Sequence, residues 1–134
     1  MDMSSVKSEM IRLHAHVCKG LADPKRLLII DALRDGEVTV TDLVDALEIP
    51  QANVSQHLAV LRDKGLVTSR RDGQWAYYSL TSPKIVQAVD LLRAVMHEQL
   101  GATAEEGAGG YKPSNKTHKS LAALLDRRVG YRFN

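Results

Sequence analysis

A proline at position 50 divides the middle of this chain into two helical segments and constrains its fold more than any other single residue. The apolar residues after it recur with helical spacing, at Val54, Leu58 and Leu61. This spacing predicts a helix over residues 51–64 with one buried face. Because the residue before a proline is pushed out of the α region, Ile49 must end the preceding helix, which covers residues 42–47. The sequence therefore predicts two short helices joined by a sharp break.

A β-hairpin is expected directly after the second helix. Asp72 and Gly73 lie between two strand-like segments, residues 66–71 and 74–80. Aspartate followed by glycine is the strongest short-range hairpin signal because both residues tolerate positive φ. Two helices with a break between them and a hairpin after them are typical of a helix-turn-helix that carries a β-wing.

The segment before this unit also has clear start and stop residues. Asp23 and Pro24 supply an N-cap and a first-turn proline for a helix that ends before Gly36. An extended link over residues 38–40 follows, and Thr41 is the expected N-cap of the next helix. The two central helices are thus preceded by a third with strong local signals.

Apolar residues at helical spacing predict one further helix near each end of the domain. The first covers about residues 5–20, and the last ends near Leu100. The fold class is therefore mainly α (α+β), a winged helix-turn-helix in the order α-α-(β)-α-α-β-β-α within residues 1–100. Residues 101–120 contain no branched aliphatic side chain, so we expect residues 101–134 to form a flexible tail whose net charge of +3 attracts DNA non-specifically.

Both terminal helices carry more apolar surface than one small core requires. The last helix has apolar residues at positions 85, 86, 89, 92, 95 and 96, and the first has a stripe at positions 6, 10, 13 and 17. Surplus apolar surface in a small domain usually marks a two-fold interface. We therefore expect a homodimer formed through the first and last helices.

The distribution of charge excludes a generally basic DNA-coating protein. The net charge is +2, but residues 21–80 contain seven basic and nine acidic side chains, so any DNA contact there must come from locally placed residues. The single cysteine, Cys18, excludes an intrachain disulfide. No apolar run approaches the roughly 20 residues of a membrane span, and the first residues lack the pattern of a signal peptide. We expect a soluble cytoplasmic protein with no membrane partner.

Sequence motifs of the common enzyme classes are missing. The chain has no dinucleotide-binding glycine pattern, no P-loop and no paired-histidine zinc helix. A lone cysteine with histidines two and four residues before it does not define a nucleophile and its base, because spatial placement decides that relation. We therefore expect a protein that is not an enzyme.

Polar side chains on the first turns of the second central helix are the candidates for reading DNA. They are Asn53, Ser55, Gln56 and His57. The major groove admits one helix, and short polar side chains on its first turns can reach base edges. Arg70, Arg71 and Gln74 lie around the hairpin turn, where a wing would contact the DNA backbone or the minor groove. A solvated helix face would show the same residues, but the break and the hairpin beside them favour DNA contact.

Several blocks of the sequence agree in order and spacing with one known family. They are Leu21-Ala-Asp-Pro-Lys-Arg-Leu27, Val54-Ser-Gln-His-Leu58, Leu61-Arg62, Gly65-Leu-Val67 and Gly73-Gln-Trp-Ala-Tyr-Tyr-Ser-Leu80. Over about residues 21–100 the chain resembles the ArsR/SmtB family of bacterial and archaeal winged-helix repressors. The resemblance implies a homodimer that binds a palindromic operator and is often released by a metal or redox signal. It assigns DNA recognition to the residues named above, to which we add Arg62.

The usual metal sites of that family do not carry over. Metalloid-responsive members have cysteines at the start of the third helix, where this chain has Thr39 and Thr41. Zinc- and nickel-responsive members use side chains of the last helix, and here non-ligands stand at three of those positions: Ser82, Lys84 and Val95. Only Glu98 remains. Threonine, lysine and valine are poor substitutes for thiolate, imidazole or carboxylate.

A non-standard metal site is a separate hypothesis. His14 and Cys18 lie one turn apart on the same face of the first helix, and His97 or Glu98 of a second subunit would complete a site. Imidazole and thiolate ligands favour Zn²⁺ or Ni²⁺. The same residues fit an inert thiol buried beside the dimer interface, and oxidation of Cys18 is a third alternative. The inducer stays open at this point.

The sequence leads to one function and one alternative from a different class. The first is a homodimeric, sequence-specific DNA-binding repressor of ArsR/SmtB type. The second is a winged-helix protein-interaction module without specific DNA binding. A footprint of operator length near physiological salt would separate them.

Overall fold

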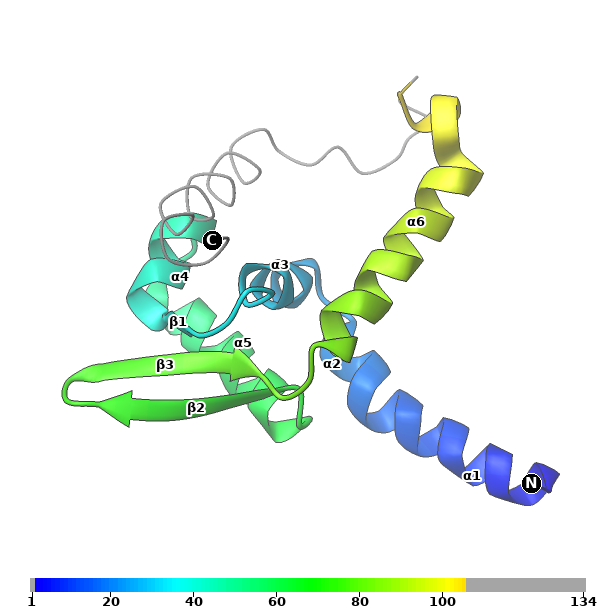
Figure 1. Cartoon of the computed structure of the whole chain (residues 1–134), viewed down its shortest axis with the longest axis horizontal. Coiled ribbons are helices and arrows are strands. Elements are labelled where there is room, and N and C mark those ends of the chain that lie inside the picture. Colours follow the sequence, from blue (N-terminus) through cyan, green and yellow to red (C-terminus); the bar gives the residue numbers. More distant parts are fainter. Residues whose placement is uncertain (1, 106–134) are drawn as a thin grey trace.

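The computed structural model describes residues 2–105, which form helices around a small antiparallel sheet (Figure 1). The N-terminal helix consists of α1 (Met3–Leu13), a π-helical turn η1 (His14–Cys18) and α2 (Lys19–Leu21). The elements that follow are α3 (Pro24–Ala32), β1 (Val38–Thr39), α4 (Val40–Leu47), α5 (Gln51–Asp63), β2 (Val67–Asp72), β3 (Trp75–Leu80) and α6 (Lys84–Glu105). This order confirms the predicted winged helix-turn-helix. The expected tail lies outside the described residues from residue 106 onward.

The turn between α4 and α5 has the predicted break at Pro50. After Leu47, Glu48 adopts a φ of 54°, in the left-handed region that residues other than glycine and asparagine rarely occupy. The backbone carbonyl of Pro50 accepts hydrogen bonds from the N–H groups of Asn53 and Val54, at 3.0 and 3.1 Å. Pro50 is the N-cap residue of α5 and supplies no side-chain hydrogen bond to it. The conformation of Glu48 was not visible in the sequence pattern.

The sheet has the strand order β1-β3-β2, and both pairings are antiparallel. Asp72 pairs with Trp75 across the turn, where Gly73 has a φ of 62°, as the Asp-Gly hairpin requires. Val38 of β1 pairs with Tyr78 of β3. The β2–β3 hairpin is therefore the wing. The strand β1, which pairs with β3, connects the wing to the start of α4.

The N-cap of α4 is Thr39, so the prediction of Thr41 is wrong. The Oγ1 atom of Thr39 accepts a hydrogen bond of 3.1 Å from the N–H group of Asp42. An N-cap residue needs a non-helical backbone, and Thr39 has one (φ −78°, ψ 157°) because it pairs with Tyr77 in the sheet. This pairing ends the extended link at residue 39 and starts the helix at Val40.

Both terminal helices are longer than the spacing of apolar residues predicts. The first covers residues 3–21 and contains the π-helical turn, in which the N–H group of Lys19 bonds to the carbonyl of His14. The last continues to Glu105, past its expected end near residue 100. Alanines in this added segment have the highest helix propensity of all residues, which favours continuation of the helix.

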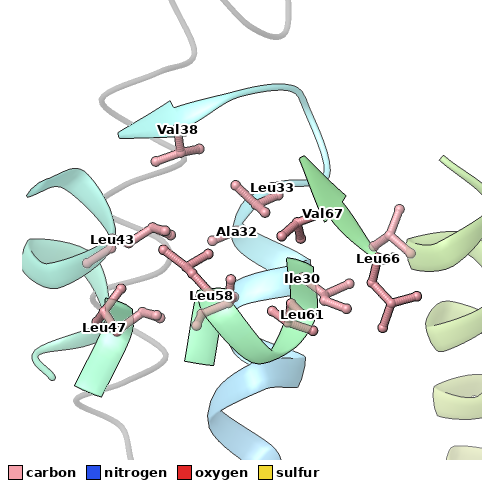
Figure 2. Close-up of a cluster of buried hydrophobic side chains, with 14 of the residues drawn as sticks. Ile30, Ala32, Leu33, Val38, Leu43, Leu47, Leu58, Leu61, Leu66 and Val67 are labelled. Carbon is pink, nitrogen blue, oxygen red and sulfur yellow. The ribbon is translucent and has the colours of Figure 1, made fainter. Parts of the chain in front are cut away.

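The hydrophobic core lies between α3, α4, α5 and the sheet (Figure 2). The predicted stripe of α5 is fully buried, because Val54, Leu58 and Leu61 are each 0% exposed. These side chains pack in one cluster with Ile30 and Leu43, and each contributes about 1.5–3 kcal/mol by its burial. The core therefore holds α5 by one face and leaves its other face to solvent.

In contrast, α1 and the outer half of α6 project from the body of the domain (Figure 1). Val86 and Val89, near the start of α6, are buried. The large apolar side chains that stay exposed on these two helices are Met3, Met10, Ile11, Leu13, Leu91, Leu92, Val95, Met96 and Leu100. Of the apolar positions predicted as surplus, Met10, Leu13, Leu92, Val95 and Met96 are exposed in the single chain, whereas Val86 and Val89 belong to the core and Val17 and Ile85 pack against it.

Arg34 connects the C-terminal end of α3 to α6 through two carboxylates. Its guanidinium donates to Asp90 at 2.9 and 3.2 Å and to Asp31 at 2.5 and 3.0 Å. The hydrogen bond from Arg34 is the main cause that holds the pKa of Asp90 below its ordinary value, and Arg93 adds to it from 3.4 Å. The pKa of Arg34 is raised in turn, mainly by its hydrogen bond to Asp90.

We expect Asp90→Asn to lower the free energy of unfolding by about 0.5 kcal/mol near pH 7, a small value because the Asp90 side chain is 40% exposed. A carboxylate whose pKa is lowered by folding stabilises the fold above its unfolded-state pKa of about 4 and loses this contribution as the pH falls through its folded-state pKa. The difference between the two proteins should therefore shrink below about pH 4. Urea unfolding near pH 7 and near pH 3 measures it.

Asp45→Asn is the control, because it removes an acidic charge from an exposed position on α4. It should have less effect near pH 7 than Asp90→Asn. An Asp90→Asn difference of equal size at both pH values would contradict the role given to the Arg34–Asp90 pair.

Candidate DNA-binding surface

The exposed face of α5 presents three of the predicted DNA-reading side chains. Asn53, Ser55 and Gln56 are exposed, while the apolar stripe of the same helix is buried. Because that stripe fixes the rotation of the helix, the polar side chains are held towards solvent, where a base edge can be reached. Arg62, in the last turn of α5, is also exposed.

His57 differs from these neighbours because it is half-buried and has a partner within the chain. The Nη1 atom of Arg26, on α3, lies 3.4 Å from Nδ1 of His57. Arg26 also donates to the backbone carbonyl of Gly20 at 2.7 Å and to that of Lys19 at 3.1 Å. Sequence reasoning missed Arg26, although it lies within a block that supports the family resemblance, because 31 positions separate it from His57.

Asp23 places a negative charge near this pair. It is the N-cap of α3, as predicted, and its carboxylate accepts a hydrogen bond of 2.8 Å from the N–H group of Lys25. Burial raises the pKa of Asp23, but hydrogen bonds from the N–H groups of Lys25 and Arg26 together with nearby positive charge outweigh burial, so the net pKa is lowered. The contact between Arg26 and His57 therefore lies beside an ionised carboxylate.

The two arginines of the wing have different surroundings. Arg70 donates to both carboxylate oxygens of Glu37, at 2.8 and 2.6 Å, and its guanidinium lies 4.5 Å from the ring centroid of Tyr77. The hydrogen bond from Glu37 is the main cause that raises the pKa of Arg70. The side chain of Arg71, which pairs through its backbone position with Ala76 in the sheet, is exposed and makes no hydrogen bond or ion pair with the described residues. Arg71 therefore keeps its charge for a partner, whereas Arg70 connects the wing to the body.

A cleft of about 290 Å³ brings the helix and the wing together. Ser55 and Gln51 line it from α5, and Arg71 and Gln74 line it from the hairpin. Trp75, which is 45% exposed, also lines it and was not among the predicted residues. The fold thus gathers Ser55, Arg71 and Gln74, three of the residues predicted from the sequence, at one place.

The residues of the metal hypothesis do not form a site within the described part of one chain. His14 and Cys18 are exposed at the two ends of the π-helical turn. His97 instead lines a cleft of about 480 Å³ between α3 and α6, together with Arg34 and Asp90. Among residues 2–105, no three His, Cys, Asp or Glu side chains converge as metal ligands would. Nor does any helix in this range have the length and apolar character needed to cross a membrane.

Comparison with known proteins places this geometry in a family. Residues 23–69 match the family described as "Bacterial regulatory protein, arsR family". The arsenical resistance operon repressor of Bacillus subtilis is 38% identical over 84 residues, which cover 62% of this chain and 80% of that protein. The nodulation protein NolR of Rhizobium meliloti is 35% identical over 100 residues, which cover 75% of this chain and 82% of that protein.

A solved structure shows the same architecture. It is the solution structure of a homodimeric winged helix-turn-helix DNA-binding domain from Mycobacterium bovis, described as a possible ArsR-family transcriptional regulator. It superimposes with a TM-score of 0.63 at 32% sequence identity and covers 70% of this chain and 87% of its own. Because relatives that this chain covers over 80% or more of their length are 35–38% identical to it, the chain belongs to the ArsR family of bacterial regulatory proteins and is a DNA-binding transcriptional regulator rather than an enzyme.

Proposed function

We propose that this protein is a homodimeric repressor that binds a palindromic operator in the cytoplasm through α5 and the β2–β3 hairpin. The observation that carries the proposal is the cleft where Ser55 of α5 meets Arg71 and Gln74 of the hairpin. A helix that reads the major groove and a wing that contacts the neighbouring backbone must lie side by side in this way. Repression is the activity named for the similar protein of Bacillus subtilis.

The roles of the side chains follow from their chemistry. Asn53 and Gln56 are exposed amides, and each can pair through two hydrogen bonds with adenine in the major groove. The hydroxyl of Ser55 both donates and accepts, so it adapts to several bases. Arg71 contributes an unpaired positive charge for a phosphate. Base contacts from α5 give specificity, and phosphate contacts from the wing give affinity and position.

The exposed apolar surfaces of α1 and α6 support the homodimer. No residue of α1, the first part of the N-terminal helix, is buried in the single chain, and helices in proteins gain most of their stability from packing of an apolar face. A second copy that covers α1 and the outer half of α6 would supply the missing burial. A two-fold dimer would place its recognition helices about 34–36 Å apart, so that the half-sites lie one DNA turn apart.

The inducer hypothesis is a Zn²⁺ or Ni²⁺ site between subunits, started by His14 and Cys18 and completed by His97 or Glu98 of the second subunit. Its support is that His14 and Cys18 are exposed on the helix whose apolar surface is free to pair. Cys18 is not buried within the single chain, so the alternative of an inert buried thiol also requires the second subunit. Oxidation of Cys18 requires the two Cα atoms to approach within about 7 Å.

A footprint tests the repressor against a protein-interaction module without specific DNA binding. The full-length protein is used to select duplexes from a random library, and the selected duplex is then footprinted near physiological salt. An operator-length protected site supports the repressor. Uniform protection without a preferred sequence would contradict it, and nothing in the described geometry favours the alternative.

Leu92→Glu should convert the dimer to a monomer at micromolar concentration while the domain stays folded. Leu92 is 65% exposed in the single chain, so a carboxylate costs little there, but a charge buried in an apolar interface is strongly unfavourable. Sedimentation velocity measures the change. Gln87→Glu, which adds the same charge at an exposed polar position of α6, is the control. A monomeric wild type, or a Leu92→Glu protein that stays dimeric, would contradict the proposed interface.

Gln56→Ala should cost about 1–3 kcal/mol for each half-site and relax the preference for one base pair, because it removes a base-edge contact. Titration of the selected operator and of its single-base variants measures both effects. The loss should be largest on the preferred base pair and small on the others. An equal loss on every sequence would mean that Gln56 contacts the backbone rather than a base.

Arg71→Ala should weaken binding to all sequences alike and flatten the dependence of affinity on salt by about one unit for each phosphate that the variant no longer neutralises. Arg70→Ala is the matched comparison, because it removes the same charge from the neighbouring position, where Glu37 already pairs with it. Its salt slope should change less. Equal slopes for the two variants would show that the pair with Glu37 opens on DNA.

A further inference from the structure

Arg26 has three hydrogen-bonding contacts that converge from different parts of the fold. Two of them are with the carbonyls of Lys19 and Gly20, at the C-terminal end of the N-terminal helix. The third is with Nδ1 of His57 on α5, at 3.4 Å. Because the carbonyls of Gly20 and Lys19 hold Nε and Nη2, the Nη1 amino group of Arg26 has a fixed position next to the imidazole.

The chemistry of this contact selects one tautomer of His57. A guanidinium has only donors and stays protonated in proteins, so Nδ1 of His57 must be the acceptor. A neutral imidazole that accepts at Nδ1 carries its proton on Nε2. Nε2 lies across the ring from Nδ1, so its N–H group is directed away from Arg26. His57 is only half-buried, next to the exposed Gln56, so solvent or a ligand has access to its ring.

We propose that Arg26 is a positioning residue that fixes His57 as the Nε2–H tautomer, so that His57 presents a hydrogen-bond donor to the operator. The part of this inference that concerns DNA rests on the proposed function. Its ligand chemistry is an acceptor on DNA, either a purine N7 or carbonyl oxygen at a base edge or a phosphate oxygen. In the other tautomer, Nε2 would be an acceptor, would repel these atoms and would leave Nδ1–H facing the guanidinium.

Through these contacts Arg26 links the C-terminal end of the N-terminal helix to α5, the helix that would read the operator. Gly20, whose carbonyl it binds, is buried, and a Cβ atom there would lie 2.6 Å from Cδ1 of Leu66. The end of the N-terminal helix is therefore packed closely against the body at the point where Arg26 holds it. A shift of that helix would move the guanidinium relative to His57.

A long-range ¹H–¹⁵N spectrum of the full-length protein tests the tautomer without DNA. In the pH range where the ring signals of His57 are those of a neutral imidazole, they should show a protonated Nε2 and an unprotonated Nδ1. Arg26→Met should change them towards a mixture of both tautomers, and thermal unfolding of that variant checks that it is folded. Lys25→Met removes a neighbouring positive charge from α3 and is the control, with His57 signals expected to stay as in the wild type. A wild-type Nδ1–H tautomer, or an Arg26→Met spectrum identical to the wild type, would overturn the proposal.

Two substitutions of His57 test the donor on DNA. His57→Gln places an amide group near the position of Nε2 and keeps a donor there, whereas His57→Asn is shorter and reaches only the position of Nδ1. Neither substitution alters Lys19 or Gly20, whose backbone carbonyls bind Arg26. His57→Asn should bind the selected operator roughly fivefold more weakly than His57→Gln for each half-site, the size of one hydrogen bond.

Adding Arg26→Met should weaken operator binding more in the wild type than in the His57→Gln background, because an amide has no tautomer for Arg26 to select. Equal affinities for His57→Gln and His57→Asn, or equal effects of Arg26→Met in both backgrounds, would overturn the donor role even if the tautomer is as proposed. If the wild-type protein binds DNA without any sequence preference, the proposed function is contradicted. The ¹H–¹⁵N spectrum then still shows whether Arg26 selects the Nε2–H tautomer of His57.

Discussion

The burial of one face of α5 is the constraint on which the DNA-binding surface depends. Val54, Leu58 and Leu61 are completely enclosed by α3, α4 and the sheet, so α5 cannot rotate without exposing apolar surface. Their fixed position determines where the exposed amides of Asn53 and Gln56 lie. Specific recognition needs side chains that are already placed before DNA arrives, because ordering them afterwards would reduce affinity. The core thus acts on function through the rotation of a single helix.

Electrostatics in this domain are local rather than general. Residues 21–80, which include α3, α4, α5 and the wing, contain nine acidic and seven basic side chains, and Glu37 already pairs with Arg70. Attraction to phosphates therefore rests on a few positions such as Arg71. Arg70, held by Glu37 and by the ring of Tyr77, instead helps to keep the wing in place. Two neighbouring arginines thus have distinct physical roles.

The surface that would read DNA and the surface suited to dimerisation lie on different helices. Side-chain contacts at two places connect these helices. The core helices carry the reading face, whereas α1 and the outer part of α6 carry exposed apolar surface suited to a second subunit. Arg34 ties α6 to α3, and Arg26 ties the end of the N-terminal helix to α5. A ligand that changed the packing of the terminal helices would bias the recognition helices only through contacts of this kind.

The sequence by itself determined the features that depend on neighbouring residues. The break at Pro50, the Asp72-Gly73 turn and the helical stripe of α5 each follow from a local rule, and together they specified the winged helix-turn-helix and the polar face. Tertiary structure decided what depends on distant partners. Pairing with β3 moved the cap of α4 to Thr39, Glu37 engaged Arg70 across 33 positions, and Arg26 reached His57 across 31. No local pattern encodes such contacts, because only the packing of helices and strands brings these atoms within hydrogen-bonding distance.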